Sequence, residues 1–289
     1  MNAGSSKVRG WAALVSTHAV LVPAAVLVGA PFVWLVCAAL KRNEDFFTST
    51  FLPGGDGFLG VEWGRVTFEH FGRLLFELGL GRAMLNSIFL SSTTAVLATV
   101  ISAMGGYALA KFEFRGRKLA QGIVLAAIII PPPLLIAPGF QWLFQLGLLD
   151  SFAGLILPAI APAFGVYLFR QAALSSVPGT LIEAARLDGC GEGRIFFGIA
   201  LPLMRPMIGA FILLTFLGTW NNFISPQVVM QSPGKFPLAV AIAQLKSTYY
   251  QDYGLLMAGT LVSVVPLMML FLVLQKEFIA GLTSGAVKG

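Results

Sequence analysis

Six long runs without Asp, Glu, Lys or Arg set the strongest limit on how this chain can fold. About 20 apolar residues in a helix cross the hydrocarbon core of a bilayer, and each run reaches or nearly reaches that length. The runs are Leu14–Leu40, Met84–Ala110, Leu119–Leu149, Phe152–Phe169, Met207–Val229 and Leu255–Gln275. A helix satisfies its own backbone hydrogen bonds in lipid, so the pattern predicts an all-α polytopic membrane protein with six transmembrane helices.

The low fraction of charged residues excludes a soluble globular protein. Charged residues make up 11% of the 289 residues, whereas soluble domains carry about 25%. The net charge of +6 would suggest nucleic acid as a partner of a soluble protein. In a membrane protein, basic residues orient the chain instead, so we expect a membrane-lipid environment and no nucleic-acid partner.

The positions of Lys and Arg predict the orientation. If the N-terminus lies in the cytoplasm, most of the 19 basic residues fall in inside segments, as the positive-inside rule requires. We therefore expect both termini inside, although Lys41 and Arg42 go against the rule. Residues 1–83 are then an N-terminal segment with the first helix and an external loop, and residues 84–289 are a five-helix core.

Two of the runs show patterns of their own. Pro131, Pro132, Pro133 and Pro138 interrupt the third run, which predicts a helix that kinks or ends there, followed by irregular chain up to Asp150. Such a stretch is either a wall of a transport pathway or a packing kink. In the second run small residues recur at helical spacing and predict close helix packing: Ser91, Ala95, Ser102, Gly106 and Ala110.

A polar stripe in the fifth run gives the candidate pathway residues. Asparagine inside a membrane needs a partner or access to water, so the stripe either bonds to neighbouring helices or lines a path for substrate. The stripe contains Thr215, Gly218, Thr219, Asn222 and Ser225, with Asn221 beside it. Three tyrosines follow at 249, 250 and 253, where they form an interfacial belt or contact a sugar or an external partner.

The chain lacks the groups that would energise transport. None of the runs contains an acidic or basic side chain except the lone His18, and no G-x-x-x-x-G-K-[ST] sequence occurs. Two histidines and two cysteines do not assemble a catalytic triad or a metal cluster. We therefore expect no enzyme activity and no cofactor in this chain, and any energy for uphill transport must enter from another subunit.

The densest cluster of charge lies between the fourth and fifth runs, in EAARLDGCGEGRIFFGIALPLMRP at 183–206. We expect a helix from Leu181 to Leu187, a break at Gly189, Gly191 and Gly193, and a second short helix from Arg194 to Ile199. The whole loop, about 175–206, is predicted to be cytoplasmic. Its small and apolar side chains indicate a docking surface.

This loop resembles a known family. Glu183-Ala184-Ala185, Asp188-Gly189, the Phe196–Phe197 pair and Leu201-Pro202 are similar to the EAA loop of permease subunits in bacterial ABC importers. Cys190 stands where that family usually has alanine. LLDSFAGLIL at 148–157, TWNNF at 219–223 and the tail FIAGLTSGAVKG at 278–289 resemble the maltose-type carbohydrate importers, in particular the smaller of their two permease subunits.

The resemblance implies an ABC type I importer permease fold in the bacterial inner membrane. It implies a heterodimer with a second permease, two copies of a cytoplasmic ATPase that binds ATP and Mg²⁺, an external solute-binding protein and a carbohydrate substrate. ATP-driven closure of the ATPases would rock the spans between inward- and outward-facing states. The alternatives are an importer for another solute, such as a polyol, glycerol phosphate or an acidic oligosaccharide, and an uncoupled channel or scaffold.

Candidate site residues fall into three roles, of which the resemblance implies the first two and the polar stripe of the fifth run the third. Coupling to the ATPase falls to Glu183, Ala184, Ala185, Asp188, Gly189, Arg194 and Pro202. For Asp188 and Arg194, as for Arg186, polar contact with a partner, an internal cap and a solvated face all stay open. The tail contact with the ATPase falls to Gly281, Leu282, Thr283, Gly285 and Lys288. The pathway-lining candidates are Thr215, Thr219, Asn221, Asn222 and Ser225.

Overall fold

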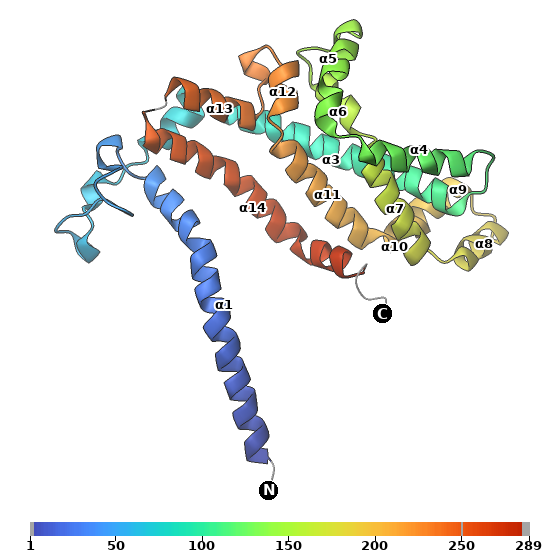
Figure 1. Ribbon diagram of the computed structural model, residues 1–289, viewed down its shortest axis with the longest axis horizontal. Coiled ribbons are helices and arrows are strands. Elements are labelled where there is room, and N and C mark those ends of the chain that lie inside the picture. The colour runs from blue at the N-terminus through green and yellow to red at the C-terminus, as the bar shows by residue number, and fades with distance from the viewer. Residues whose placement is uncertain (1–2, 250, 285–289) are drawn as a thin grey trace. The chain divides into compact units, whose positions relative to one another are not determined.

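The structure, a computed structural model, describes residues 3–249 and 251–284, and the side chains of 14–249 and 251–276. Every named element in this part of the chain is a helix (Figure 1). Only two isolated bridges, Lys41–Val66 and Gly54–Val61, pair extended backbone there. The all-α prediction is confirmed.

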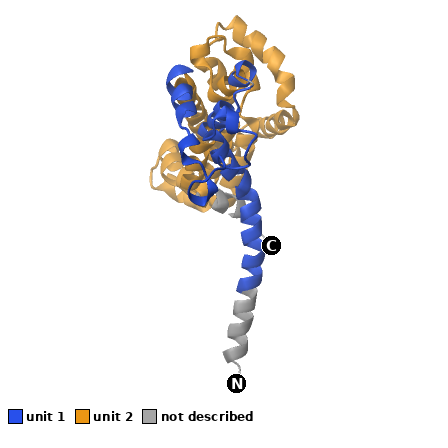
Figure 2. Ribbon diagram, turned by 90° about the vertical axis from the view of Figure 1, so that its left-hand side faces the viewer, with its two compact units in different colours: residues 1–78, 245–262 blue, residues 79–244, 263–289 orange. Residues whose placement is uncertain are grey.

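The chain divides into two compact units, coloured separately in Figure 2. Unit 1 comprises residues 1–78 and 245–262, and unit 2 comprises 79–244 and 263–289. Unit 1 ends a few residues before the predicted boundary at residue 83, and it also includes 245–262, which the prediction counted with the second part.

Unit 1 begins with α1, Ala3–Ala39. Its apolar side chains from Leu14 to Val36 are largely exposed, as expected of a helix that meets lipid on all sides. The short 3₁₀ helices η1 (Asn43–Asp45), η2 (Phe58–Gly60) and η3 (Trp63–Arg65) follow, then α2 (Glu69–Gly72) and the π-helical η4 (Arg73–Glu77).

Buried polar groups hold the loop of unit 1 together. The Lys41 ammonium is almost wholly buried and donates to the carbonyl of Ser49, and burial lowers the pKa of Lys41. His70 Nε2 lies 2.9 Å from the carbonyl oxygen of Lys41. Arg73 pairs with Asp252 at 3.1 Å, so residues from both ends of the chain meet within this unit.

Unit 2 is built around α3, Leu80–Lys111, which packs mainly against α7 (Ala163–Ser176) and α11 (Arg205–Trp220). The small residues predicted to mediate close packing are all buried in α3: Ser91, Ala95, Ser102, Gly106 and Ala110. At Gly106 a Cβ would lie 2.5 Å from the backbone nitrogen of Arg170 on α7. The packing role of this stripe is confirmed.

Proline breaks two of the predicted spans into bent pairs. The third run forms α4 (Arg117–Ile129), η5 (Pro132–Leu135) and α5 (Ile136–Gln145), with a bend of 99°. Residues before proline avoid the helical region, and Ile130 and Pro131 are extended there. The predicted kink at the prolines is confirmed, whereas the predicted irregular stretch up to Asp150 is shorter than expected, because the helix resumes as α5 and ends only at Gln145. The fourth run forms α6 (Phe152–Ala159) and α7, bent by 42°.

The fifth predicted span, Met207–Val229, is wrong as a single helix. The helix α11 ends at Trp220, and the separate short helix α12 runs from Ile224 to Val229. Pro226 has no N–H to continue the ladder and clashes with the carbonyl four residues before it, which is that of Asn222. The remaining helices are α13, Leu238–Thr248, and α14, Tyr253–Ser284.

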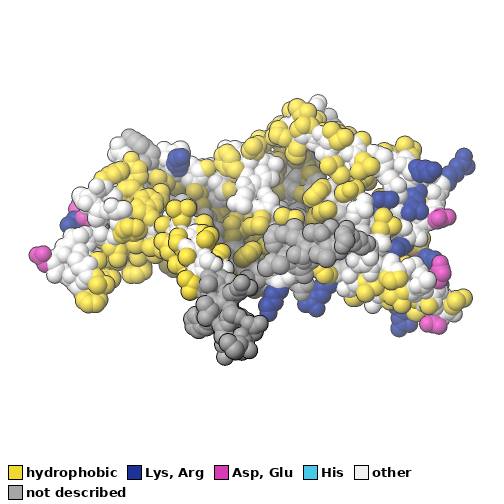
Figure 3. Space-filling model, turned by 60° about the horizontal axis from the view of Figure 1, so that its bottom comes forward, with side chains coloured by type: hydrophobic (Ala, Val, Ile, Leu, Met, Phe, Trp, Pro, Cys, Tyr) yellow, Lys and Arg dark blue, Asp and Glu magenta, His cyan; other side chains and the backbone are white. Residues whose placement is uncertain are grey.

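Within the described residues, three single helices are long and apolar enough to cross a membrane: Leu14–Ala39, Leu80–Lys111 and Tyr253–Lys276. The number rises to six if each of three bent pairs is one span. Hydrophobic side chains cover much of the surface visible in Figure 3, as expected of a protein in lipid. On unit 2, many of the charged side chains in this view gather at the end that carries α8 (Gly179–Leu187) and α9 (Glu192–Ile195).

Candidate translocation cavity and coupling loop

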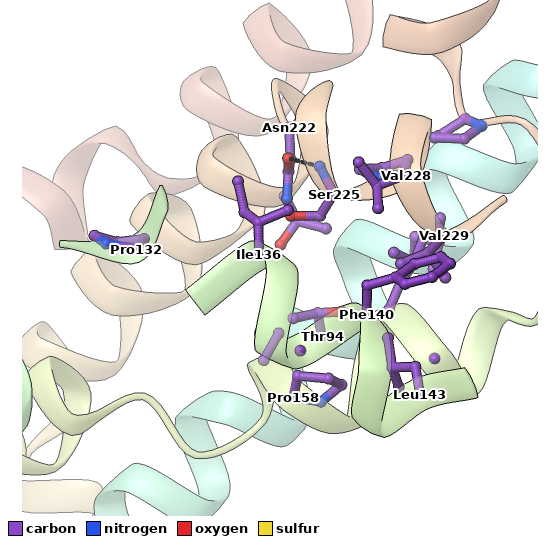
Figure 4. A pocket seen from close by; sticks show the side chains of 18 of the residues that line it. Thr94, Pro132, Ile136, Phe140, Leu143, Pro158, Asn222, Ser225, Val228 and Val229 are labelled. Carbon is purple, nitrogen blue, oxygen red and sulfur yellow. Dashed lines mark hydrogen bonds between the residues drawn. The ribbon is translucent and has the colours of Figure 1, made fainter. Parts of the chain in front are cut away.

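A cavity of about 380 Å³ opens within unit 2 (Figure 4). Its walls come from α3, α5, α6 and α12, with further residues from the end of α11 and the turn after it. Most of its lining is apolar, including Ile136, Phe140 and Leu143 from α5. The polar side chains in the wall are Ser87, Ser91, Thr94, Thr219, Asn222 and Ser225.

Three of the five predicted pathway residues meet at this cavity: Thr219, Asn222 and Ser225. The Asn222 side-chain oxygen accepts a hydrogen bond from the backbone N–H of Ser225 at 3.2 Å, the contact drawn in Figure 4. This bond satisfies one of the free N–H groups in the first turn of α12, whose N-cap residue is Phe223.

The other two predicted pathway residues lie elsewhere. Asn221 is exposed, and its amide donates to the carbonyl of Leu217 at 3.0 Å. Thr215 is half-buried and is not among the cavity-lining residues. Thr215 shares α11 with Thr219 but lies one helical turn earlier, and Asn221 follows the end of α11 at Trp220, where the helical spacing of the stripe no longer applies.

The hydroxyls of α3 are cavity residues that the sequence analysis did not identify. Ser87, Ser91 and Thr94 are buried and stand at i, i+4 and i+7. Ser87 accepts a hydrogen bond from the backbone N–H of Leu238 at 2.7 Å. For Ser91 the sequence favoured packing over a substrate role. The spacing of the three hydroxyls on one helix face was the signal that could have identified them.

Asp150, in the turn between α5 and α6, gathers several donors. Its carboxylate accepts from the backbone N–H groups of Gln231 and Ser232 at 3.0 and 2.9 Å. It also accepts from the Ser232 hydroxyl at 2.6 Å and the Lys235 ammonium at 2.9 Å. Hydrogen bonding from Lys235, together with that from Ser232 and Gln231, holds the pKa of Asp150 well below its usual range.

The neighbouring residues of LLDSFAGLIL have structural roles. Ser151 caps α6: its hydroxyl accepts from the N–H of Gly154 at 3.1 Å and donates to the carbonyl of Leu148 at 2.6 Å. A Cβ at Gly154 would collide with that same carbonyl oxygen. Close backbone packing at this turn therefore explains both the serine and the glycine.

The predicted coupling loop consists of two short helical segments around a left-handed glycine. The first is α8, which begins after Pro178. Gly189, at φ +78°, makes the turn. The second begins at Glu192 and continues through α9, the π-helical η6 (Phe196–Ala200) and α10 (Leu201–Leu203). The predicted break at Gly193 is wrong, because that glycine lies inside α9. The change of chain direction between the two helical segments takes place at Gly189.

The loop is anchored in the core of unit 2. Ile182, Ala185, Ile195 and Phe196 are buried in one cluster with Tyr107 and Phe169 from the spans. Within the loop α8 packs against α9, and η6 packs against α3, where the ring centres of Tyr107 and Phe196 lie 5.3 Å apart.

The predicted coupling residues differ in exposure. Glu183, Ala184, Asp188, Gly189, Arg194 and Pro202 are exposed. Ala185 is 7% exposed and lies in the core, so it is not part of the contact surface that the sequence analysis described. Leu187 and Phe197, 89% and 57% exposed, provide apolar surface instead.

Arg186 closes the loop on itself. Its Nε donates to Glu192 at 2.6 Å, and its guanidinium lies 5.8 Å from the centre of the Phe112 ring. The hydrogen bond with Glu192 raises the pKa of Arg186. Of the roles left open for Arg186, the structure favours the internal cap.

The predicted tail contact is only partly within the described chain. Gly281, Leu282 and Thr283 belong to the last turns of α14. Gly285 and Lys288 lie outside the described residues.

Comparison with known proteins relates the chain to one family. The family described as "Binding-protein-dependent transport system inner membrane component" matches residues 98–282. The arabinooligosaccharides transport system permease protein AraQ of Halalkalibacterium halodurans is 42% identical over 225 residues, which cover 78% of this chain and 80% of that protein. The diacetylchitobiose uptake system permease protein NgcG of Streptomyces coelicolor is 32% identical over 290 residues, covering 99% and 92%.

The fold is also found in a solved structure. A chain in the crystal structure of a bacterial ABC transporter involved in the import of the acidic polysaccharide alginate superposes with a TM-score of 0.76. The two chains are 22% identical, and the match covers 96% of this chain and 99% of the other.

Proposed function

Because the chain belongs to the family of binding-protein-dependent transport system inner membrane components, we propose that it is the permease subunit of an ATP-driven oligosaccharide importer. The observation that carries the proposal is that one helix, α3, serves both candidate sites. Its first half lines the cavity through Ser87, Ser91 and Thr94. Its second half contributes Ala103 and Tyr107 to the core that anchors the coupling loop.

The proposed assembly pairs this chain with a second permease in a heterodimer on two copies of an ATPase, and the ATPase binds ATP and Mg²⁺. A solute-binding protein delivers the substrate. Glu183, Ala184, Asp188, Gly189 and Arg194 present the exposed coupling surface. Buried Ala185 positions it, and Pro202 lies within α10, which begins at Leu201. Closure of the ATPases pushes this loop, and the spans move with it in alternating access.

A neutral saccharide is the proposed substrate. The relatives above are named for arabinooligosaccharides and diacetylchitobiose, and a third, LacG of Rhizobium radiobacter, for lactose. Hydroxyl and amide side chains in the cavity suit sugar hydroxyls, because each both donates and accepts hydrogen bonds. None of the described cavity-lining residues carries a charge, which favours a neutral solute over glycerol phosphate or an acidic oligosaccharide.

Reconstitution tests the proposal. The chain is coexpressed with the proteins encoded beside it, the complex is purified by a tag on this chain, and uptake into proteoliposomes is measured with labelled arabinotriose, diacetylchitobiose, lactose and an alginate trisaccharide. We expect a second permease and an ATPase to copurify, and ATP-dependent uptake of a neutral sugar. Copurification of neither protein supports the uncoupled channel or scaffold, and uptake of the alginate trisaccharide alone supports the acidic solute.

A further inference from the structure

The contacts of Asp150 join two turns that lie far apart in the sequence. One is the turn between α5 and α6, and the other is the segment between α12 and α13. We call Asp150, Gln231, Ser232 and Lys235 the Asp150 clamp. The carboxylate accepts four hydrogen bonds from the other three residues, a number that fills the acceptor capacity of an ionised carboxylate.

The main chain of Asp150 takes part as well. Its N–H donates to the carbonyl of Val229 at 2.9 Å, and its own carbonyl accepts from the Lys235 ammonium at 2.6 Å. The residue has φ +52°, a conformation that costs a non-glycine residue free energy and persists where its surroundings fix it. Here the six hydrogen bonds fix it.

The clamp lies directly behind the cavity wall. Val229, which accepts from the Asp150 N–H, is the last residue of α12 and lines the cavity. Gly154 of α6 also lines it, and a Cβ there would lie 3.3 Å from a methyl group of Val229. The hydrogen bonds of Asp150 therefore hold the end of α12 against the start of α6.

We propose that Asp150 is a positioning residue for transport, which through the Asp150 clamp makes α5, α6 and α12 move as one rigid wall of the cavity. The inference rests on the proposed function. The alternative, a latch that opens in every cycle, would have to break two main-chain contacts and four contacts of an ionised carboxylate each time. Hydrogen bonds to charged groups are among the stronger ones in proteins, so a permanent clamp fits the contacts better.

A disulfide in place of the clamp separates the two possibilities. The side chains of Asp150 and Ser232 are in direct contact, with Ser232 Oγ 2.6 Å from Asp150 Oδ2, so a cysteine pair is placed at these two positions, and thiol titration after oxidation establishes that the disulfide has formed. Asp150→Cys with Ser232→Cys is made with Cys37 and Cys190 replaced by alanine, and the complex is assayed in proteoliposomes after oxidation and after reduction. The readout is arabinotriose moved per ATP hydrolysed, together with the rate of ATP hydrolysis.

A rigid wall predicts opposite results in the two redox states. The reduced pair lacks the carboxylate, so we expect uptake per ATP to fall several-fold while ATP hydrolysis continues. Oxidation should restore uptake per ATP to the level of the cysteine-free parent. If the disulfide stops uptake and ATP hydrolysis, the contact opens in the cycle and the inference is wrong. Unchanged uptake per ATP in the reduced state also overturns it.

A milder variant covers the case in which the cysteine pair prevents assembly. Lys235→Met removes only the ammonium contacts and keeps both backbone N–H donors, and Lys246→Met is its matched control at an exposed lysine. We expect a several-fold loss of uptake per ATP for Lys235→Met alone, and equal values in the two variants contradict the inference.

The cysteine-free parent separates the two proposals. A parent without ATP-driven uptake counts against the proposed function, whereas a working parent with the contrary variant results counts against the clamp alone.

Discussion

At the scale of single residues, the adjacent asparagines Asn221 and Asn222 have different surroundings. Asn222 lines the cavity and accepts a hydrogen bond from the first turn of α12 at Ser225, whereas Asn221 is exposed and bonds only within its own helix turn. We expect Asn222→Ala to lower the rate of saccharide uptake several-fold, because it removes a polar group from the cavity and a hydrogen bond worth about 1 kcal/mol. Asn221→Ala should transport like the wild type. Uptake into proteoliposomes at matched protein levels measures both.

The comparison of the two asparagines has a clear contrary outcome. Equal losses in both variants would mean that the TWNNF segment acts as a unit rather than through the cavity. A loss in Asn221→Ala alone would place the path on the other side of α11.

A second adjacent pair, Gly105 and Gly106, tests the contact between α3 and α7. A Cβ at Gly106 would lie 2.5 Å from backbone nitrogen and 2.7 Å from backbone carbon of α7, whereas a Cβ at Gly105 would meet only Val166 methyls at 3.5 Å. Overpacking typically costs about 1–3 kcal/mol, so Gly106→Ala should lower the thermal stability of the purified complex. Gly105→Ala should not, because alanine makes ordinary contact there and favours the helix. Equal melting temperatures for both variants would contradict the close approach.

At the scale of elements, the sequence predicts which segments are apolar better than where helices break. The run from Met84 to Ala110 is α3 almost residue for residue, because nothing interrupts its own hydrogen bonding. The third run shows the limit. Its prolines identify the break, but nothing local shows that the chain turns by 99° and continues as α5. That direction is set by packing of α5 against α12, which lies later in the chain.

The same reasoning explains what was missed at the site. Regular spacing aligned Thr215 with Thr219 and Asn222, yet only the last two line the cavity. Thr215 shares α11 with Thr219 but lies one helical turn earlier, whereas Asn222 lines the cavity from the turn that follows the end of α11 at Trp220. Ser91 was assigned to packing correctly, but the neighbouring cavity could not be predicted. The cavity is enclosed by residues of α3, α5, α6 and α12 together. The spacing of residues along one helix does not show which other helices lie opposite it.

The turn of the coupling loop gives a prediction about α8. Gly189 has φ +78°, whereas Gly193 lies in helix α9, and at neither position would a Cβ meet a neighbour within 4 Å. The left-handed conformation costs other residues about 1–2 kcal/mol. We therefore expect Gly189→Val to displace α8 and to uncouple ATP hydrolysis from uptake while the protein still inserts. Gly193→Val is the matched control, and coupling should persist in it.

Coupling is measured as saccharide moved per ATP in proteoliposomes. Normal values for Gly189→Val would remove α8 from the proposed coupling path. Loss in both glycine variants would instead indicate that any added side chain blocks the loop, whatever its backbone conformation.

The end of α14 gives the second prediction at this scale. The helix reaches Ser284, and the resemblance of GLTSGAVKG to the maltose-type tail implies contact with the ATPase. Deletion of residues 283–289 should change the rate of ATP hydrolysis by the complex without loss of assembly. Basal and substrate-stimulated rates that both equal those of the full chain would refute the tail contact.

At the scale of the whole molecule, the function depends on having the coupling loop and the ATPases on the same side of the membrane. The distribution of Lys and Arg predicts that side to be the cytoplasm, and the native Cys190 in the loop, half-buried, can report it. With Cys37 replaced by alanine, a membrane-impermeant maleimide should label Cys190 in inside-out vesicles and not in intact spheroplasts. Asp56→Cys, in a chain without Cys37 and Cys190, is the control for the opposite face, because Asp56 is exposed in the predicted external loop. It should label only in spheroplasts. Labelling of Cys190 from the spheroplast side would place the coupling loop outside and invert the predicted topology, and no cytoplasmic ATPase could then drive this chain through α8.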